Sequence, residues 1–168
     1  MRVERLRPRD ATEYRALMLE AYELNPSAFT STVEERAALP MSWWEARLSD
    51  APEAREVVVG LRDDDVLWGV AGMAFNTRQK IRHKATLFGI YVKKSQRGSG
   101  AAARLIVAAL DEARKRAGLQ VVQLTVTEDN PAAEELYKKM GFVAFGTEPF
   151  AVAVDGGYIS KIHMWRRL

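Results

Sequence analysis

Residues 85–92 restrict the possible folds of this chain more than any other segment. Read as an extended strand, they place apolar side chains on both sides: Leu87, Gly89 and Tyr91 on one side, and Phe88, Ile90 and Val92 on the other. A strand that is apolar on both sides is stable only where both sides are covered. The segment therefore predicts a central strand in a sheet with a helical layer on each side.

The rest of the chain supplies the other strands and the helices of those layers. Period-two apolar patterns predict strands at Val3–Leu6, Glu56–Leu61, Val66–Phe75, Leu119–Thr127, Phe142–Val154 and Tyr158–Trp165. Helical periodicity predicts helices over residues 10–25, 42–48, 100–117 and 130–141. The order β-α-α-β-β-β-α-β-α-β-β combines hairpins with crossovers. It predicts an α/β fold with three α/β/α layers and a mixed sheet, in a single domain of residues 1–168.

Two of the predicted helices begin with capping signals. Asp10 and Glu13 have the spacing of a capping box. Asn130 precedes Pro131, and proline is tolerated at the first helical position because no intrahelical hydrogen bond is lost there. We expect both pairs to start helices.

Composition excludes several kinds of site. The 168 residues contain no cysteine and only two histidines, which rules out disulfides, thiolate ligands and a cysteine nucleophile and gives no reason to expect a metal. The net charge of +3 is too small to indicate nucleic-acid binding. The longest apolar run, Leu105–Leu110, is too short to cross a membrane, and the first residues lack the apolar core of a signal peptide. We therefore expect a cytoplasmic protein with no membrane partner.

The segment between the central strand and the next helix contains the strongest chemical signal. It reads Gln96-Arg97-Gly98-Ser99-Gly100-Ala101-Ala102. Small residues let a ligand approach the backbone closely, and the first N–H groups of a helix have no partner within that helix. The helix dipole and the nearby cations Lys93, Lys94 and Arg97 add positive potential. The segment favours binding of a phosphate or diphosphate over a turn that is merely solvated.

Of two common nucleotide-binding motifs, one is absent from these glycines and the other matches them only loosely. A P-loop needs Lys and then Ser or Thr after its last glycine, whereas Gly100 is followed by Ala101. Gly98-x-Gly100-x-x-Ala103 matches the loose dinucleotide fingerprint, but residues 93–96 separate the strand from the glycines. A dinucleotide turn follows its strand tightly, so that match is weak.

At these residues the sequence resembles the GCN5-related N-acetyltransferase (GNAT) family. The family signature Gln/Arg-x-x-Gly-x-Gly/Ala is matched by residues 97–102. A second stretch, Asn130 to Phe142, is similar to the family's second motif at the expected distance. The resemblance covers roughly Val66 to Phe142. Glu148-Pro149 and His163-Met164, in the last strand pair, look like one common bacterial branch.

The resemblance implies the GNAT fold, acetyl-CoA as the donor and a primary amine of a small molecule or peptide as the acceptor, with direct transfer. It assigns the diphosphate to the backbone N–H groups from Gly98 to Ala102, with Arg97 beside them. It also pairs the pantetheine arm with strand residues Ile90 to Val92. Gly89 supports this independently, because a glycine inside a central strand often marks a bulge or the close approach of another group.

By the same resemblance, Tyr137 is the general acid that protonates the departing thiolate, and Asn130 contacts the coenzyme as well as capping its helix. A phenol with a pKa of about 10 is protonated at neutral pH, and a thiol with a pKa of about 8.5 leaves more easily when it is protonated. Periodicity alone would place Tyr137 in the core, because it lies on an apolar helix stripe with Ala133, Leu136 and Met140.

The acceptor side is less determined. Where many family members have a glutamate base, this chain has Thr86, which leaves solvent or one of three residues to take the amine proton: Glu128, Glu34 or His83. The acceptor pocket is expected in the N-terminal third, among acidic and aromatic side chains: Glu20, Glu23, Glu34, Glu35, Phe29, Trp43 and Trp44. Lys161 occupies a position that is usually acidic in the bacterial branch, and it disfavours a strongly cationic acceptor.

Two other functions compete with this interpretation. The missing strand glutamate motivates a non-catalytic module that senses acyl-CoA. Nucleic-acid binding would use a basic segment without interleaved aromatic residues, which ranks it last: Arg78, Lys80, Arg82, His83 and Lys84. The sequence favours an acetyl-CoA-dependent N-acetyltransferase, and the resemblance together with the long last strands favours a homodimer.

Overall fold

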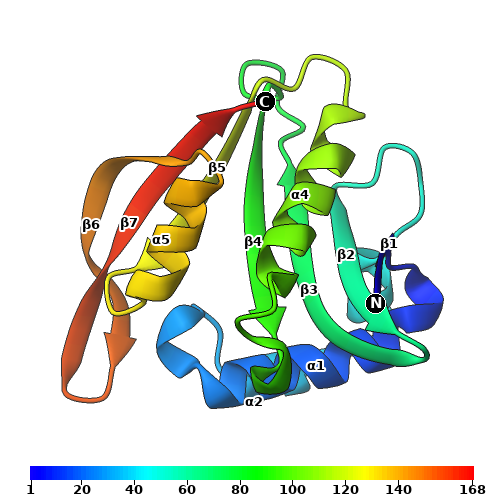
Figure 1. Ribbon diagram of the computed structural model, residues 1–168, viewed down its shortest axis with the longest axis horizontal. Coiled ribbons are helices and arrows are strands. Elements are labelled where there is room, and N and C mark those ends of the chain that lie inside the picture. Colours follow the sequence, from blue (N-terminus) through cyan, green and yellow to red (C-terminus); the bar gives the residue numbers. More distant parts are fainter.

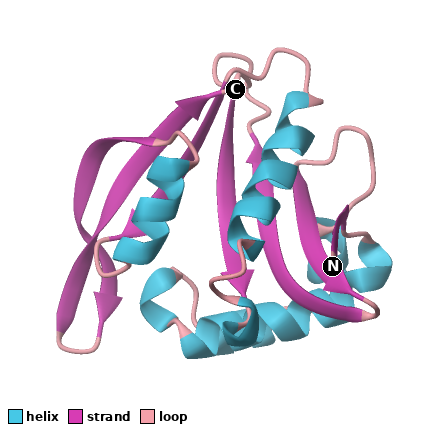
Figure 2. Cartoon of the chain, viewed as in Figure 1, coloured by secondary structure: helices cyan, strands magenta, loops and turns pink.

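The computed structural model describes residues 1–168 and contains one mixed sheet with the strand order β1-β2-β3-β4-β5-β7-β6 (Figures 1 and 2). The strands are β1 (Arg2–Arg5), β2 (Glu56–Asp63), β3 (Val66–Phe75), β4 (Lys84–Val92), β5 (Val121–Thr127), β6 (Val143–Val154) and β7 (Gly157–Arg167). The helices are α1 (Ala11–Leu24), α2 (Val33–Ala37), α3 (Met41–Arg47), α4 (Ala101–Arg114) and α5 (Pro131–Lys139). The predicted mixed sheet with helical layers is confirmed.

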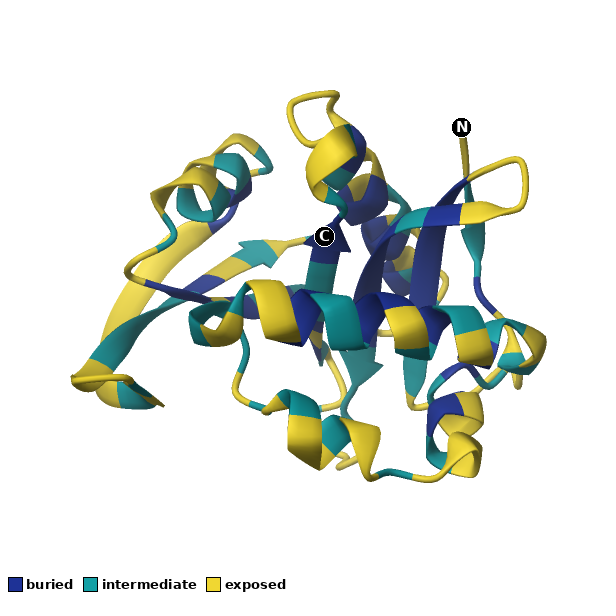
Figure 3. Ribbon diagram, turned by 90° about the horizontal axis from the view of Figure 1, so that it is seen from below, coloured by how far each residue is buried: buried dark blue, intermediate teal, exposed yellow.

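Two buried clusters hold the layers together, one on each face of the sheet. On one face, Ile106 and Leu110 of α4 pack on Met73 and Val122 of the sheet, in a cluster that also includes Tyr137 of α5. On the other face, α1 and α3 bury Tyr14 and Trp44 against Leu67 and Val70 of β3 and Tyr91 of β4. Figure 3 shows α4 and α5 on one side of the sheet and the N-terminal helices on the opposite side. β4 is thus covered on both faces, as its sequence predicts.

β4 and β5 are parallel neighbours that separate along their length. Their backbones pair only where Lys84–Thr86 faces Val121–Gln123. β4 then continues to Val92 and β5 to Thr127, and the two strands diverge in Figure 1. From Leu87 onward, the edge of β4 that faces β5 therefore has no strand beside it.

β4 contains a bulge, so its side chains do not alternate in the way that the sequence predicts. The register against β3 passes from Gly72↔Phe88 to Val70↔Tyr91, so β4 contains one extra residue. Gly89, with φ of 60°, lies in this bulge. Because of the extra residue, Leu87 packs under α4 while Tyr91 packs on the opposite face. The expectation that both lie on one face was wrong.

The start of α1 also differs from the prediction. Asp10 is the N-cap residue of α1, as predicted, but its side chain makes no capping hydrogen bond there, and its Oδ2 instead accepts the Arg7 N–H at 2.8 Å. The buried guanidinium of Arg62 contacts both carboxylates, at 3.5 Å from Asp10 and 2.8 Å from Glu13, and Glu13 also accepts the Leu67 N–H at 2.7 Å. The need to compensate a buried cation outweighs the local capping pattern. The Asn130 cap is confirmed, with its Oδ1 accepting the Ala133 N–H at 3.2 Å.

One helix was not predicted. α2 is a single turn whose cap, Thr32, accepts the Glu35 N–H while Glu35 accepts the Thr32 N–H. This capping box is visible in the sequence, but the turn is too short for periodicity to reveal it. No helix of the structure has the length and apolarity that a membrane crossing requires.

Candidate active site

Two adjoining cavities open where β4 and β5 separate. The larger, about 860 Å³, lies against the start of α4 and is called the α4 cavity. The smaller, about 470 Å³, lies between β4, β5 and the segment from α1 to α3 and is called the β4 cavity. Both cavities are lined by Ala28, Phe29, Ile90, Asn130 and Tyr137. A ligand in the α4 cavity can therefore present one end to a second ligand in the β4 cavity.

Free backbone donors surround the start of α4. No oxygen of the chain accepts a hydrogen bond from the N–H groups of residues 98–103, and the first helical bond is that from the Arg104 N–H to the Gly100 oxygen, at 3.1 Å. Gly98 and Gly100 have φ of 79° and 81°, a conformation that glycine adopts without strain. Unpaired donors at the positive end of a 14-residue helix form an anion site, which fits a diphosphate.

The structure separates the predicted phosphate residues into different roles. Arg97 lines the α4 cavity. Its guanidinium Nε donates to the Val92 oxygen at 3.2 Å, so this part of the side chain stabilises the loop. Ser99 does not line the cavity, and its hydroxyl donates to the Gln96 oxygen at 2.7 Å. Lys93 and Lys94 line neither cavity, and Lys93 pairs with Glu20 at 3.7 Å.

The predicted strand residues also border the α4 cavity. Ile90, Tyr91 and Val92 line it along the edge of β4 that β5 leaves open. Tyr91 is held in place because its hydroxyl donates to Glu20 at 2.8 Å. Burial and this hydrogen bond raise the pKa of Tyr91 to about 12, so the phenol remains a donor. An open strand edge beside a cavity can accept an extended arm as an additional strand.

Tyr137 lies where the two cavities meet. Its ring packs against Phe142, with centroids 6.2 Å apart, and the residue is 9% exposed. No protein group forms a hydrogen bond with its hydroxyl. Burial raises the pKa of Tyr137 to about 12, so the phenol stays protonated at neutral pH. It is therefore both a core residue, as periodicity indicates, and a proton donor within reach of both cavities.

Thr86 lines the β4 cavity, whereas the three residues considered as bases do not. Thr86 lies in one cross-strand row with Ala74 of β3 and Glu56 of β2. The three residues are Glu34, Glu128 and His83, and Glu128 instead accepts the Ser160 N–H at 3.0 Å. None of the three is brought to the junction at Tyr137.

Most of the residues expected on the acceptor side do not line the β4 cavity. Of the acidic and aromatic candidates, only Phe29 lines the β4 cavity. Trp44 is fully buried in the core, and Glu20 and Glu35 are committed to Tyr91 and Thr32. The charged residues that do line the cavity come from elements that sequence patterns do not place together: Arg36, Arg47, Glu56 and Lys161.

Comparison with known proteins identifies the family to which this geometry belongs. The model of the "Acetyltransferase (GNAT) family" matches residues 18–142. The chain belongs to the GNAT acetyltransferase family. A curated relative, L-amino acid N-acetyltransferase AaaT of Escherichia coli (strain K12), is 29% identical over 124 residues, which is 73% of this chain and 74% of that protein.

Solved structures of GNAT acetyltransferases have the same fold. An acetyltransferase of the family from Streptococcus pneumoniae superposes with a TM-score of 0.88 at 24% identity, covering 99% of both chains. YncA, a putative acetyltransferase from Salmonella typhimurium solved with acetyl-CoA, has a TM-score of 0.81 at 21% identity, covering 100% of this chain and 94% of that one. The predicted family and fold are confirmed, and the chain is an acetyltransferase of the GNAT family.

Proposed function

We propose that this GNAT enzyme transfers the acetyl group directly to the primary amine of a small molecule, with no covalent enzyme intermediate. The observation that carries the proposal is the junction of two cavities at Tyr137, where donor and acceptor can meet. The chain has no cysteine to carry an acetyl group. The name of the relative from Escherichia coli, an L-amino acid N-acetyltransferase, supports a small amine as the acceptor.

In this proposal acetyl-CoA occupies the α4 cavity. The N–H groups of residues 98–102 and Arg97 hold the diphosphate, and the open edge of β4 at Ile90 to Val92 aligns the pantetheine arm. Asn130 contacts the arm opposite β4 while its side chain caps α5. The thioester then lies at the junction with the β4 cavity, beside Tyr137.

The transfer step follows from that placement. The neutral amine attacks the thioester carbon, so the C–N bond forms as the carbonyl π electrons move to oxygen. When the carbonyl re-forms, the C–S bond breaks, and the thiolate takes a proton from the Tyr137 hydroxyl. The amide nitrogen loses its extra proton, which restores the Tyr137 phenol directly or through water. The products are the N-acetylated amine and CoA in its thiol form. Starting from the neutral amine, the reaction neither takes up nor releases a proton.

No protein group takes the first proton from the acceptor ammonium in this scheme. Glu56 is the only carboxylate that lines the β4 cavity, and both of its oxygens bind Arg47, at 2.8 and 3.3 Å. The Glu56 carboxylate is therefore held by Arg47 and is not free to bind the acceptor ammonium. We assign that proton to solvent, so kcat/KM should rise with pH as the free acceptor amine is deprotonated.

Two measurements test the function. Calorimetry should show that CoA binds, and a thiol-release assay with acetyl-CoA should show turnover with small primary amines. Binding of NAD(P) without binding of CoA would contradict the donor assignment. Binding of CoA without thiol release from any amine or peptide acceptor would favour the sensing module instead.

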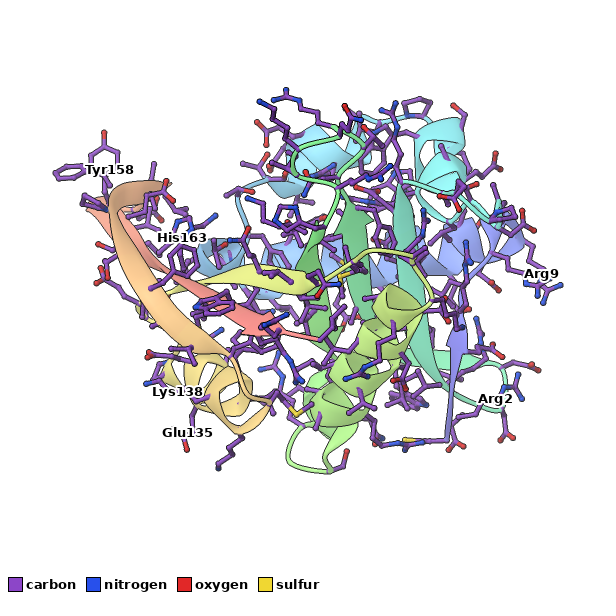
Figure 4. The ribbon with its side chains drawn as sticks, turned by 90° about the horizontal axis from the view of Figure 1, so that it is seen from above. Arg2, Arg9, Glu135, Lys138, Tyr158 and His163 are labelled. Atoms are coloured by element: carbon purple, nitrogen blue, oxygen red, sulfur yellow. The ribbon has the colours of Figure 1, made fainter.

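We also propose that the enzyme forms a homodimer through the β6–β7 hairpin. β6 is an edge strand, and several large apolar side chains of the hairpin are exposed: Val143, Phe145, Phe150, Tyr158 and Trp165. Tyr158 projects at the outer end of the hairpin, far from the helices (Figure 4). A second copy would cover both the apolar side chains and the unpaired strand edge. Light scattering should give twice the chain mass for the wild type and the chain mass for Phe145→Ser; a monomeric wild type would contradict the dimer.

A further inference from the structure

We infer that the acceptor amine also carries a carboxylate, and that Arg36 is the residue that binds it. This inference rests on the proposed transfer to a small amine, and it concerns the chemical class of that amine. The observation that carries it is the charge of the β4 cavity, which differs from what the sequence predicted. The acidic candidates lie elsewhere, and the cavity is lined by cations in excess.

Arg36 is a partly buried cation without a counter-ion. It extends from α2 into the lining of the β4 cavity and forms no ion pair with any carboxylate of the chain. Its Nε is buried and has no hydrogen-bond partner. Its guanidinium carbon lies 4.7 Å from the ring centre of Trp43 and 6.0 Å from that of Tyr22. The two rings hold the guanidinium plane in the cavity wall and offer it no anion.

Arg47 provides a comparison within the same cavity. Its guanidinium carbon lies 4.8 Å from the centre of the same Trp43 ring, but the guanidinium is paired with both oxygens of Glu56. The single carboxylate of the cavity is therefore already used. Nothing in the chain compensates Arg36 in the same way.

The opposite wall adds a further positive charge. Lys161 of β7 also lines the cavity and forms no ion pair. Three cations and one carboxylate line the space, so an acceptor that is only cationic, such as a polyamine, would be repelled. A carboxylate would be attracted, and the planar fork of arginine matches it with two parallel hydrogen bonds.

The size of the cavity limits the acceptor further. Its volume of about 470 Å³ suits a small molecule, with the amine at Tyr137 and the carboxylate at Arg36, because both residues line this one cavity. In a peptide the N-terminal amine and the C-terminal carboxylate are separated by the chain, so a peptide would leave Arg36 unpaired. The acceptor class that fits is a small amino-carboxylic acid.

Matched acceptors test this directly. Thiol release is measured with a panel of L-amino acids and with their carboxamides, which keep the amine and remove the negative charge. The enzymes compared are the wild type, Arg36→Gln, Arg36→Lys, and Arg82→Gln as a control that removes an exposed positive charge outside both cavities. Because each variant is compared with the wild type for the same acceptor, differences in amine pKa between acid and amide cancel.

Arg36→Gln should raise KM for the amino acids about tenfold or more, change KM for the carboxamides less than about twofold, and leave CoA affinity unchanged by calorimetry. Arg36→Lys should fall between the wild type and Arg36→Gln, and Arg82→Gln should match the wild type. Equal changes for acids and amides would assign Arg36 a merely structural role and overturn the inference. Preferred turnover of polyamines or carboxamides by the wild type would overturn it while leaving the transferase function intact, whereas absence of turnover with every acceptor would overturn the function itself.

Discussion

In the proposed reaction, Tyr137 is the one protein side chain that transfers a proton. Burial raises the pKa of Tyr137, which keeps the phenol protonated. The hydroxyl has no protein partner, and the residue lines both cavities. A proton donor that is fixed by packing on its ring and free at its oxygen is suited to protonating a leaving thiolate. The same features explain why apolar periodicity alone assigns this residue to the core.

Removing the Tyr137 hydroxyl should separate catalysis from binding. Tyr137→Phe keeps the ring packing, so we expect kcat to fall about 100-fold or more while the dissociation constant of CoA changes less than about twofold. Thiol-release kinetics and calorimetry measure the two quantities. An unchanged kcat would show that the thiolate leaves without this acid, and a parallel loss of CoA affinity would show that Tyr137 is a binding residue.

The raised pKa of Tyr137 also makes stability depend on alkaline pH. The folded protein holds the phenol neutral up to about pH 12, whereas the unfolded chain ionises near pH 10. The stability contributed by the neutral buried phenol is complete below pH 10 and is lost as the pH rises toward 12, at up to about 1.4 kcal/mol per pH unit. Urea unfolding at pH 8 and pH 11 should show a smaller loss for Tyr137→Phe than for the wild type. Equal losses would mean that burial does not shift this group.

Among the elements, the start of α4 and the bulged strand β4 line the α4 cavity, where we propose that the donor binds. Three features could be predicted from the sequence because each depends on neighbours along the chain: the glycine segment, the Asn130 cap and the strand that is apolar on both faces. The bulge at Gly89 was foreseen as an irregularity, but its effect on Leu87 and Tyr91 was not, because one extra residue reverses every side chain beyond it. The capping hydrogen bonds of Asp10 and Glu13 were mispredicted because Arg62, distant in the sequence, binds both carboxylates.

Two glycines offer a matched test of the α4 anion site. Gly100 and Gly118 have φ of 81° and 78°, and no atom lies within 4 Å of a Cβ added to either. Substitution of either glycine by alanine should therefore strain the backbone to a similar extent and lower the free energy of unfolding by about 1 kcal/mol. Only Gly100→Ala should also weaken CoA binding, by about tenfold or more, because the strain is relieved by moving the free N–H groups.

Unfolding midpoints and CoA calorimetry on the two glycine variants give the answer. Equal stability losses with a selective loss of CoA affinity in Gly100→Ala support the anion site. If Gly118→Ala, which lines neither cavity, weakened CoA binding to the same extent, the effect would be general destabilisation and the anion site would lose its support.

At the scale of the molecule, the separation of β4 from β5 creates one opening with a cavity on each side. The sequence predicts the layers and the donor side because both arise from local patterns and from a motif. On the acceptor side it predicts the N-terminal third, which supplies part of the lining of the β4 cavity, but it does not predict the charged residues there, which come from α2, α3, the start of β2 and β7. Arg36 and Arg47 are ordinary surface-type residues in the sequence, and the tertiary structure brings them to the cavity that Lys161, expected on the acceptor side from the family resemblance, also lines.

Two cavities that meet predict a kinetic mechanism in which both substrates are bound together. Initial rates with acetyl-CoA and the acceptor both varied should give intersecting double-reciprocal lines. Parallel lines, or an acetylated enzyme detected by mass spectrometry after acetyl-CoA is added alone, would indicate a covalent intermediate and contradict direct transfer.

A crystal structure of the protein with CoA tests the central claim most directly. The account predicts that the diphosphate oxygens accept hydrogen bonds from the N–H groups of residues 98–102 and that the pantetheine arm follows β4 from Val92 to Ile90. The sulfur should then lie beside the Tyr137 hydroxyl, facing the β4 cavity. A nucleotide bound elsewhere, with protein side chains closing the start of α4, would contradict the account.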